Sequence, residues 1–238
     1  AGAKEPALKD ISFCAMAGQT IGVIGGTGSG KSTLVNLIPR FYDAASGQVL
    51  VDGTDVKEYS LDELRDKTGV VPQKSVLFKG TLRDNMRWGK QDASDEEIYR
   101  ALDTAQAREF VDSKGEGLDL YIDQGGHNLS GGQRQRLTIA RALVRRPEIL
   151  IMDDSASALD FATDARLRKA IRENTGDMTV FIVSQRATTI KSADTLLVLD
   201  EGRLAGMGTH KELLKDCQVY REICLSQLSK EEVERDEQ

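Results

Sequence analysis

The sequence predicts an α/β fold built on a parallel sheet with helices on both faces. Three observations support this prediction: short runs rich in Ile, Val and Leu recur along the chain, helical segments separate them, and the first run leads through a glycine-rich loop into a helix. Strands buried on both faces need such apolar runs, and parallel neighbours need a crossover between them. The strands expected on this basis cover residues 19–24, 69–73, 148–153, 179–184 and 196–199.

Residues 25–32 match the phosphate-loop pattern Gly-x4-Gly-Lys-Ser at every fixed position. The strand expected before them and a helix expected over residues 32–38 supply the context that this motif requires. Glycines let backbone N–H groups reach phosphate oxygens, Lys31 offers a charge to the β- and γ-phosphates, and Ser32 offers a hydroxyl to Mg²⁺. The residues expected to bind the nucleotide here are Gly25, Gly26, Thr27, Gly28, Ser29, Gly30, Lys31, Ser32 and Thr33.

The composition excludes several classes of protein. Hydrophobic residues make up 39% and charged residues 29% of the 238 residues, which is typical of a globular domain with a sizeable core. The net charge of -6 and the lack of a basic, aromatic-rich stripe argue against a nucleic-acid partner. The three cysteines, Cys14, Cys217 and Cys224, are an odd number without metal-binding spacing, which excludes a disulfide framework and favours a reducing compartment. Cys14 is expected to be a small core residue.

The remaining segments predict two further strands, a short helix and a mostly helical insert. Strands are expected over residues 8–18 and 48–53, and a short helix over residues 61–67. Residues 74–134 have little strand character and are expected to form a mostly helical insert.

The two ends of the chain and one helix start carry further predictions. Ser94 and Glu97 have the spacing of a capping box at the start of a helix. Residues 211–228 have helical apolar spacing, and the charged end after Ser229 is expected to fray. No run approaches the ~18 apolar residues of a membrane span. Because the chain starts at Ala1 without Met, it is expected to be part of a longer protein.

A second motif ends the expected strand at residues 148–153. Four apolar residues run there into Asp153, which is the Walker B arrangement, in which the carboxylate holds the Mg²⁺ that bridges the phosphates. Many buried strands end in Asp, so the motif is weak alone. Together with the phosphate loop, it predicts a magnesium-dependent nucleotide site.

The third motif, residues 129–133 (LSGGQ), is the most specific signal in the chain. Ser130 is expected to cap a helix over residues 135–144, and Gly131 and Gly132 leave backbone N–H groups bare. This is a second helix start suited to anions, and one nucleotide cannot need both in the same chain. We therefore expect each nucleotide to lie between two such domains, one supplying the phosphate loop and the other the Ser-Gly-Gly helix.

These motifs together resemble the nucleotide-binding domain of ABC transporters, over essentially the full chain. Gln73 matches the family's Q-loop glutamine, residues 157–160 match its D-loop, and residues 72–82 resemble exporter-type domains. The resemblance implies a P-loop NTPase fold, with a RecA-like parallel-sheet core, an N-terminal antiparallel β part, and a helical insert that carries the signature motif.

The resemblance also implies residue roles and a domain organisation. One ATPase domain is expected over residues 1–238, with a core lobe at about 1–73 and 135–238 and a helical subdomain at about 74–134, preceded in the longer chain by a transmembrane domain. The cofactors implied are ATP and Mg²⁺. The implied nucleotide contacts beyond the phosphate loop are Gln73, Ser130, Gly131, Gly132, Gln133 and Asp160, and the implied magnesium ligands are Ser32, Gln73 and Asp153.

Two residues depart from the family pattern at positions with catalytic roles. Asp154 stands where the family usually has the Glu that orients the attacking water, and its carboxylate is withdrawn by about one C–C bond, ~1.5 Å. Gln185 stands in Ser-Gln-Arg where the family usually has Ser-His-Arg. An amide can donate to a γ-phosphate but cannot carry a proton or a charge as imidazole does. Both changes point to a site that binds ATP and cleaves it slowly or not at all.

The signature at residues 129–133 is nevertheless undamaged, and it would complete the site of a partner domain. The chain thus resembles the degenerate-site subunit of bacterial heterodimeric multidrug or lipid exporters. Its expected partners are ATP, a second nucleotide-binding domain from a different subunit, and the transmembrane domain of its own chain, without nucleic acid. The expected location is the cytoplasmic face of a bacterial plasma membrane.

Alternatives to this interpretation remain open from the sequence. Asp154 could serve as a working base in a homodimeric exporter. A non-transport ATPase of the same class, or a regulatory ATP-binding module, would carry the same motifs. Trp88 fits either the core or a surface that receives the membrane domain, and His210 fits a packing role in a terminal helix.

Overall fold

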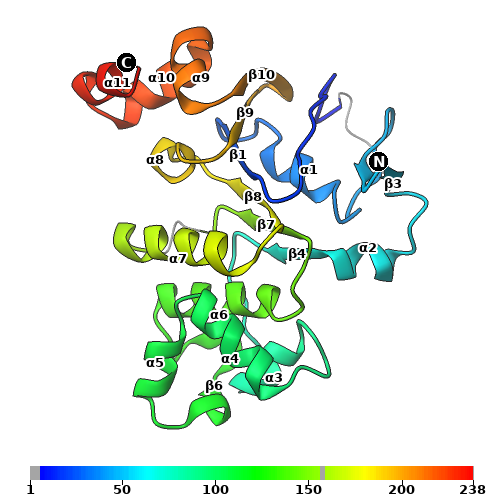
Figure 1. The fold of residues 1–238 in the computed structure, drawn as a ribbon, viewed down its shortest axis with the longest axis vertical. Helices are drawn as coiled ribbons and strands as arrows, with labels where there is room; N and C mark the ends of the chain where they lie inside the picture. Colours follow the sequence, from blue (N-terminus) through cyan, green and yellow to red (C-terminus); the bar gives the residue numbers. More distant parts are fainter. Residues whose placement is uncertain (1–5, 156–158, 238) are drawn as a thin grey trace. The chain divides into compact units, whose positions relative to one another are not determined.

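The structure is a computed structural model that describes residues 6–155 and 159–237 (Figure 1). The chain divides into two compact units. The first unit comprises Ala1–Thr68 with Thr179–Gln238, and the second unit comprises Gly69–Met178. None of the described helices is long and apolar enough to cross a bilayer.

The sheet of the first unit is centred on β1 (Thr20–Gly25). This strand pairs in parallel with β8 (Thr179–Val183) on one side and with β9 (Thr195–Asp200) on the other. The last strand, β10 (Arg203–Gly208), runs antiparallel to β9. The central strands are almost completely buried, so helices cover them on both sides. The predicted α/β fold with a parallel sheet is therefore confirmed.

Short elements complete the N-terminal part of the first unit. Helix α1 (Lys31–Asn36) follows β1 through the glycine-rich loop, and β2 (Leu50–Val51) and β3 (Thr54–Asp55) form an antiparallel pair. Helix α2 (Leu61–Lys67) begins with a capping box in which the Ser60 side chain accepts from the Glu63 N–H.

The strand predicted over residues 8–18 does not form. Within the described residues of this stretch, Lys9 donates one backbone hydrogen bond to Gly202, at 2.8 Å, and no strand is present. Asp10 has φ 54°, in the left-handed region, which breaks an extended run. Cys14 is exposed, so the prediction that it lies in the core is also wrong.

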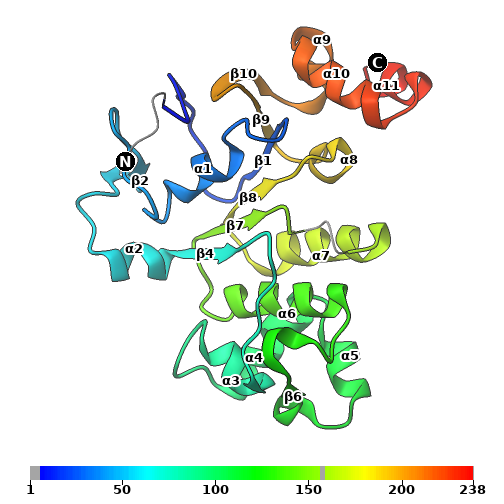
Figure 2. The same cartoon turned by 180° about the vertical axis from the view of Figure 1, so that it is seen from behind.

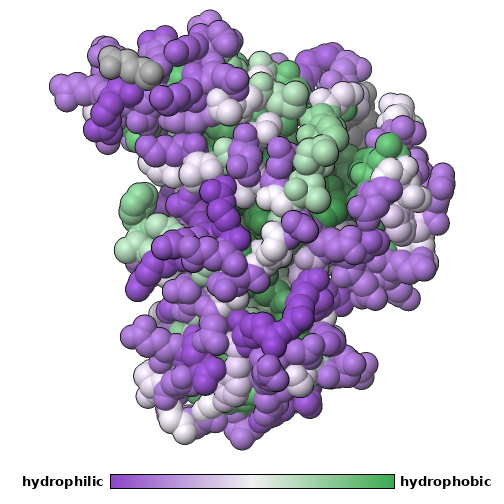
Figure 3. Space-filling view, in the orientation of Figure 1, coloured by the Kyte–Doolittle hydropathy of each residue, from purple (hydrophilic) through white to green (hydrophobic). Residues whose placement is uncertain are grey.

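The first unit ends in three helices, α9 (His210–Asp216), α10 (Gln218–Gln227) and α11 (Lys230–Glu237). We call them the C-terminal cap. The prediction that the chain frays after Ser229 is wrong, because Ser229 accepts from the Glu232 N–H and caps α11. Val233 on that helix is 1% exposed. Figure 3 shows that the outer face of these helices is mostly hydrophilic, which is why the sequence looked like a solvated tail.

The second unit holds two neighbouring strands of a sheet, a short strand pair and a group of helices. Strand β4 (Thr68–Val71) lies beside β7 (Ile149–Asp153), and a short pair is formed by β5 (Gly80–Thr81) and β6 (Tyr121–Ile122). Residues 74–134 are otherwise mostly helical (Figure 2). The helices of this unit are α3 (Leu82–Arg87), α4 (Asp95–Thr104), α5 (Arg108–Ser113), α6 (Gly131–Leu143) and α7 (Phe161–Asn174), with 3-10 turns at Gly117–Asp119 and Gln124–Gly126.

The capping box predicted at the start of α4 is confirmed. The Ser94 hydroxyl accepts from the Glu97 N–H at 3.2 Å, and the Glu97 carboxylate accepts from the Ser94 N–H at 3.0 Å. This reciprocal pair satisfies backbone donors that the first turn of a helix would otherwise leave bare.

Candidate nucleotide-binding site

The glycine-rich loop leaves the buried end of β1 and enters α1. A Cβ atom on Gly25 would lie 2.1 Å from the Leu199 carbonyl oxygen, so the neighbouring strand leaves room only for glycine there. Gly30 has φ 96° at the N-cap of α1, a conformation that glycine adopts without strain. By contrast, a Cβ on Gly26 or Gly28 would meet nothing within 4 Å. The loop is thus fixed at both ends and open along its middle.

Lys31 closes this loop from inside. Its side chain is mostly buried, since the residue is 8% exposed, and its ammonium donates to the carbonyl oxygens of Gly25, at 2.8 Å, and Gly26, at 2.7 Å. The buried Ser29 donates its N–H to Gly26 at 3.2 Å. Ser32 and Thr33 follow in the first turn of α1, where Ser32 is exposed. A positive charge and the start of a helix therefore lie at the open loop.

Gln185 belongs to the same unit as the loop. Strands β1 and β8 are parallel with Val23 opposite Val183, so the loop and Gln185 both follow the carboxyl ends of neighbouring strands. The hydroxyl of the buried Ser184 accepts from the Arg186 N–H at 3.0 Å, which fixes the turn at Gln185. In open α/β sheets, ligands bind at this edge.

The second unit brings Gln73 and Asp154 together. Gln73 follows β4 and Asp154 follows β7, and the Gln73 Nε2 donates to the Asp154 Oδ2 at 3.3 Å. Asp153 ends β7, directly after three buried residues. Asp154 has φ 46°, in the left-handed region that aspartate tolerates better than most residues. Asp153, Asp154 and Gln73 therefore gather at the carboxyl ends of neighbouring strands.

The signature motif forms the capped start of α6. The predicted cap is confirmed, because the Ser130 hydroxyl accepts from the Gln133 N–H at 3.2 Å and the Gln133 side chain accepts from the Ser130 N–H at 3.0 Å. The helix begins at Gly131, four residues before the predicted start at Gln135. Gly131 and Gly132 thus lie in its first turn, where backbone N–H groups have no partner within the helix.

One contact in the second unit could not be expected from the sequence. The Ser75 hydroxyl donates to the Gln135 side-chain oxygen, and Gln135 is 2% exposed. This hydrogen bond joins the segment after Gln73 to the signature helix α6. No local pattern indicates it, because the partners are 60 residues apart.

Part of the predicted D-loop lies outside the described residues, namely Ser157 and Ala158. Asp160, the last residue of that motif, caps α7 by accepting from the Thr163 N–H at 2.9 Å and the Thr163 hydroxyl at 2.7 Å. These hydrogen bonds hold the pKa of the Asp160 carboxyl below its ordinary value, with the backbone N–H of Thr163 as the largest cause. Asp160 is therefore ionised at neutral pH and serves at least as a helix cap.

The donor set fits a nucleotide polyphosphate with Mg²⁺. The phosphate loop offers an open row of glycines, a buried ammonium and a helix start, all suited to phosphate. The first unit offers the Ser32 hydroxyl, and the second unit offers the Gln73 amide oxygen and the Asp153 carboxylate. Each is an oxygen group of the kind that Mg²⁺ prefers.

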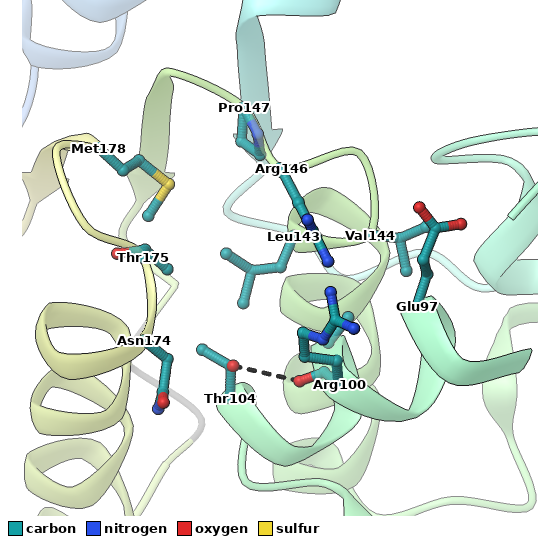
Figure 4. Close-up of a pocket in the computed structure, with 11 residues that line it drawn as sticks. Glu97, Arg100, Thr104, Leu143, Val144, Arg146, Pro147, Asn174, Thr175 and Met178 are labelled. Carbon is teal, nitrogen blue, oxygen red and sulfur yellow. Dashed lines mark hydrogen bonds between the residues drawn. The ribbon is translucent and has the colours of Figure 1, made fainter. Parts of the chain in front are cut away.

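Other candidate positions lie apart from these motifs. Trp88 is 69% exposed, which excludes the core role that the sequence had left open. His210 begins α9 and its Nδ1 lies 2.8 Å from the Tyr220 hydroxyl, so its predicted packing role is confirmed. A cavity of about 320 Å³ in the second unit is lined by none of the motif residues (Figure 4). It is lined by Glu97, Arg100, Ala101, Thr104, Leu143, Val144, Arg146, Pro147, Asn174, Thr175 and Met178.

Comparison with known proteins decides the family. Residues 8–157 match the family described as ABC transporter. The chain belongs to the ABC transporter family. An uncharacterized ABC transporter ATP-binding protein of Mycobacterium tuberculosis is 49% identical over 229 residues, which cover 95% of this chain and 39% of that protein. An ATP-dependent lipid A-core flippase of Haemophilus influenzae is 42% identical over 229 residues, covering 96% of this chain and 39% of the flippase.

A solved structure is similar to this ABC transporter chain as well. The structure of a bacterial Atm1-family ABC exporter with ATP bound has a TM-score of 0.89 at 38% sequence identity, covering 94% of this chain and 40% of that chain. The likeness confirms the predicted P-loop NTPase fold. The chain spans 39% of the length of the curated relatives named above.

Proposed function

We propose that this chain is the ATP-binding motor domain of an ABC exporter, and that its own catalytic site hydrolyses ATP slowly. The observation that carries the proposal is the pair Asp154 and Gln185, which stand where the family has its Glu and His. The rest of the nucleotide machinery is intact, including the phosphate loop and the capped signature helix. The ABC exporter with ATP bound that this chain resembles supports the exporter assignment.

In this proposal, ATP is held by the phosphate loop, and Mg²⁺ is held by Ser32, Gln73 and Asp153. When bound, Mg²⁺ neutralises the charge that develops on the phosphates. Lys31 exchanges its contacts with the loop carbonyls for contacts with phosphate oxygens. The hydroxyl of Ser130 and the bare N–H groups of Gly131 and Gly132 meet the nucleotide of a partner domain, together with Gln133 and Asp160.

The slow step follows from the length and chemistry of two side chains. The carboxylate of Asp154 is about 1.5 Å shorter in reach than that of Glu, and a ~1 Å misplacement of a catalytic group can cost about a hundredfold in rate. Gln73 also holds this carboxylate through a hydrogen bond of 3.3 Å. Gln185 can donate to the γ-phosphate, but it cannot accept and release a proton near neutral pH.

The proposal includes a heterodimer and a membrane domain. An intact signature beside a weak catalytic site is useful when the partner carries a competent catalytic site.

The exposed Trp88 ring lies 4.8 Å from the ring of Phe78, and Arg141 lies over the Phe78 ring at 5.5 Å. These residues form an apolar patch with Val76 on the second unit. We assign this patch to a transmembrane domain of the same, longer chain, at the cytoplasmic face of a bacterial plasma membrane. The named flippase relative makes lipid-like substrates the first to test.

The test is ATP turnover by the native chain beside the double variant Asp154→Glu with Gln185→His, at high protein concentration and with ATP binding measured in parallel. We expect the native chain to bind ATP and hydrolyse it at least about tenfold more slowly than the double variant. Ordinary family rates in the native chain would make Asp154 a working base and a homodimeric exporter the better assignment. Failure to bind ATP would contradict the nucleotide-binding role itself.

A further inference from the structure

The C-terminal cap touches the turn that carries Gln185. The side chain of Gln227, the last residue of α10, donates through Nε2 to the Gln185 carbonyl oxygen at 2.7 Å. Its Oε1 accepts from the Ala187 N–H at 2.9 Å. Ala187 begins α8 (Ala187–Ile190), so one amide group holds both sides of the turn between β8 and α8.

The chemistry of this contact requires an amide. Ala187 N–H can only donate and the Gln185 carbonyl can only accept, so the amide of Gln227 satisfies both in a single orientation. A carboxylate of the same length would keep the hydrogen bond from the Ala187 N–H and would repel the Gln185 carbonyl oxygen. An apolar side chain would lose both.

The helix that carries Gln227 is itself firmly placed. Tyr220 and Cys224 on α10 are fully buried. Helix α11 adds a second attachment to α8, because Asp236 pairs with Lys191, the residue after that helix, at 3.0 Å. Gln227 therefore reaches the turn from a rigid support rather than from a mobile tail.

By contrast, the side chain of Gln185 has no hydrogen-bond partner among the described residues, and the residue is exposed. Its backbone is held while its amide remains available to a ligand. The backbone at Gln185 sets the point from which this side chain starts, and the contact with Gln227 holds that backbone.

From this geometry we propose that Gln227 is a positioning residue for Gln185: it holds the turn so that the Gln185 amide meets the γ-phosphate of ATP. The inference rests on the proposed function, because it requires that Gln185 contact the γ-phosphate. ADP lacks this phosphate. The contribution of Gln227 should therefore affect binding of ATP and leave binding of ADP unchanged.

The experiment is a double-mutant cycle with Gln227→Leu and Gln185→Ala in the full chain. The affinities for ADP and for a non-hydrolysable ATP analogue are measured with Mg²⁺ by equilibrium titration. We expect each single variant to bind the analogue at least about tenfold more weakly, since a hydrogen bond to a charged group contributes on this scale. Binding of ADP should stay within about twofold. The double variant should be no weaker than Gln185→Ala alone, because both act through one side chain.

Two further variants separate positioning from mere packing. Gln227→Glu keeps the length and the bond to the Ala187 N–H but repels the Gln185 carbonyl, so it should weaken analogue binding as well. Gln218→Leu is the matched control: Gln218 lies on the same helix, and its amide donates to Glu222 at 2.8 Å, away from the turn. This control should change neither affinity.

The outcomes distinguish this inference from the proposed function. If Gln185→Ala weakens analogue binding and Gln227→Leu does not, or if their effects add, only the positioning role fails. If Gln185→Ala leaves both affinities unchanged, the γ-phosphate role of Gln185 fails and the positioning role fails with it. If Gln227→Leu weakens the binding of ADP as much as the binding of the analogue, Gln227 has a general structural role and the inference is overturned.

Discussion

The phosphate loop and the C-terminal cap are two regions of the first unit that are stabilised in different ways. In the loop, Lys31 bonds to Gly25 and Gly26, which are six and five residues away. In the cap, Asp236 bonds to Lys191 across 45 residues and to His210 across 26. The loop is therefore a local structure set by its own residues, whereas the cap depends on the docking of distant segments.

The largest expected effect is on the affinity of the phosphate loop for ATP. Lys31→Ala removes the only charge in the phosphate-loop motif and should weaken ATP binding about a hundredfold or more, since charge-assisted hydrogen bonds to phosphate are among the strongest. Equilibrium titration with ATP measures this. Lys169→Ala removes a charge from an exposed pair with Glu173 and should leave the affinity unchanged. Equal losses in both variants would contradict a specific role for Lys31.

A smaller effect should separate the fixed end of the loop from its open middle. Gly25→Ala places a Cβ 2.1 Å from the Leu199 carbonyl oxygen and should lower the free energy of unfolding by about 2 kcal/mol or more. In Gly26→Ala the added Cβ meets nothing within 4 Å, so this variant should have the same free energy of unfolding as the native chain. Chemical denaturation measures both. Similar stabilities would show that the strand next to Gly25 can give way.

The smallest effect concerns the cap and pH. Burial lowers the pKa of His210 below its ordinary value of about 6.5, against the opposing effect of Asp236, so the folded chain favours the neutral ring. The unfolded chain then takes up the proton first, and the free energy of unfolding falls as the pH drops below about 6.5. Asp236, whose pKa is lowered chiefly by its hydrogen bond with Lys191, loses its contribution only in more acidic solution.

Denaturation between pH 7 and pH 5 tests this expectation. His210→Gln should reduce the loss of stability over this range, because the titrating ring next to Tyr220 is gone. The control is His127→Gln, which removes the other histidine at an exposed position outside the C-terminal cap. A native chain whose stability is flat over this range would contradict the expectation.

The same difference explains what could be predicted from the sequence. The phosphate loop and the caps at Ser94 and Ser130 each depend on residues that are close together in the sequence. The structure has all three where the sequence patterns predicted them. The charged end after Ser229 looked unfolded because it has a single apolar residue, Val233, which is buried in the folded chain, where α11 packs against α9 and α10. Gln227 and Gln185 are 42 residues apart, so no local sequence pattern indicates their contact.

The failed strand at residues 8–18 has a different cause. Alternating apolar residues there matched a strand, but a strand forms only with a partner edge, and Lys9 finds one backbone partner at Gly202. The left-handed backbone at Asp10 then interrupts the pattern. Periodicity reports which residues prefer burial and cannot report which edge is available.

The hydrogen bond between Ser75 and Gln135 has a consequence for energy transfer within the second unit. Any shift of the segment after Gln73 must either carry the signature helix α6 with it or break this bond and leave a buried amide without its partner. The segment at Ser75 and the signature helix α6 are therefore mechanically coupled through one part-buried side-chain contact.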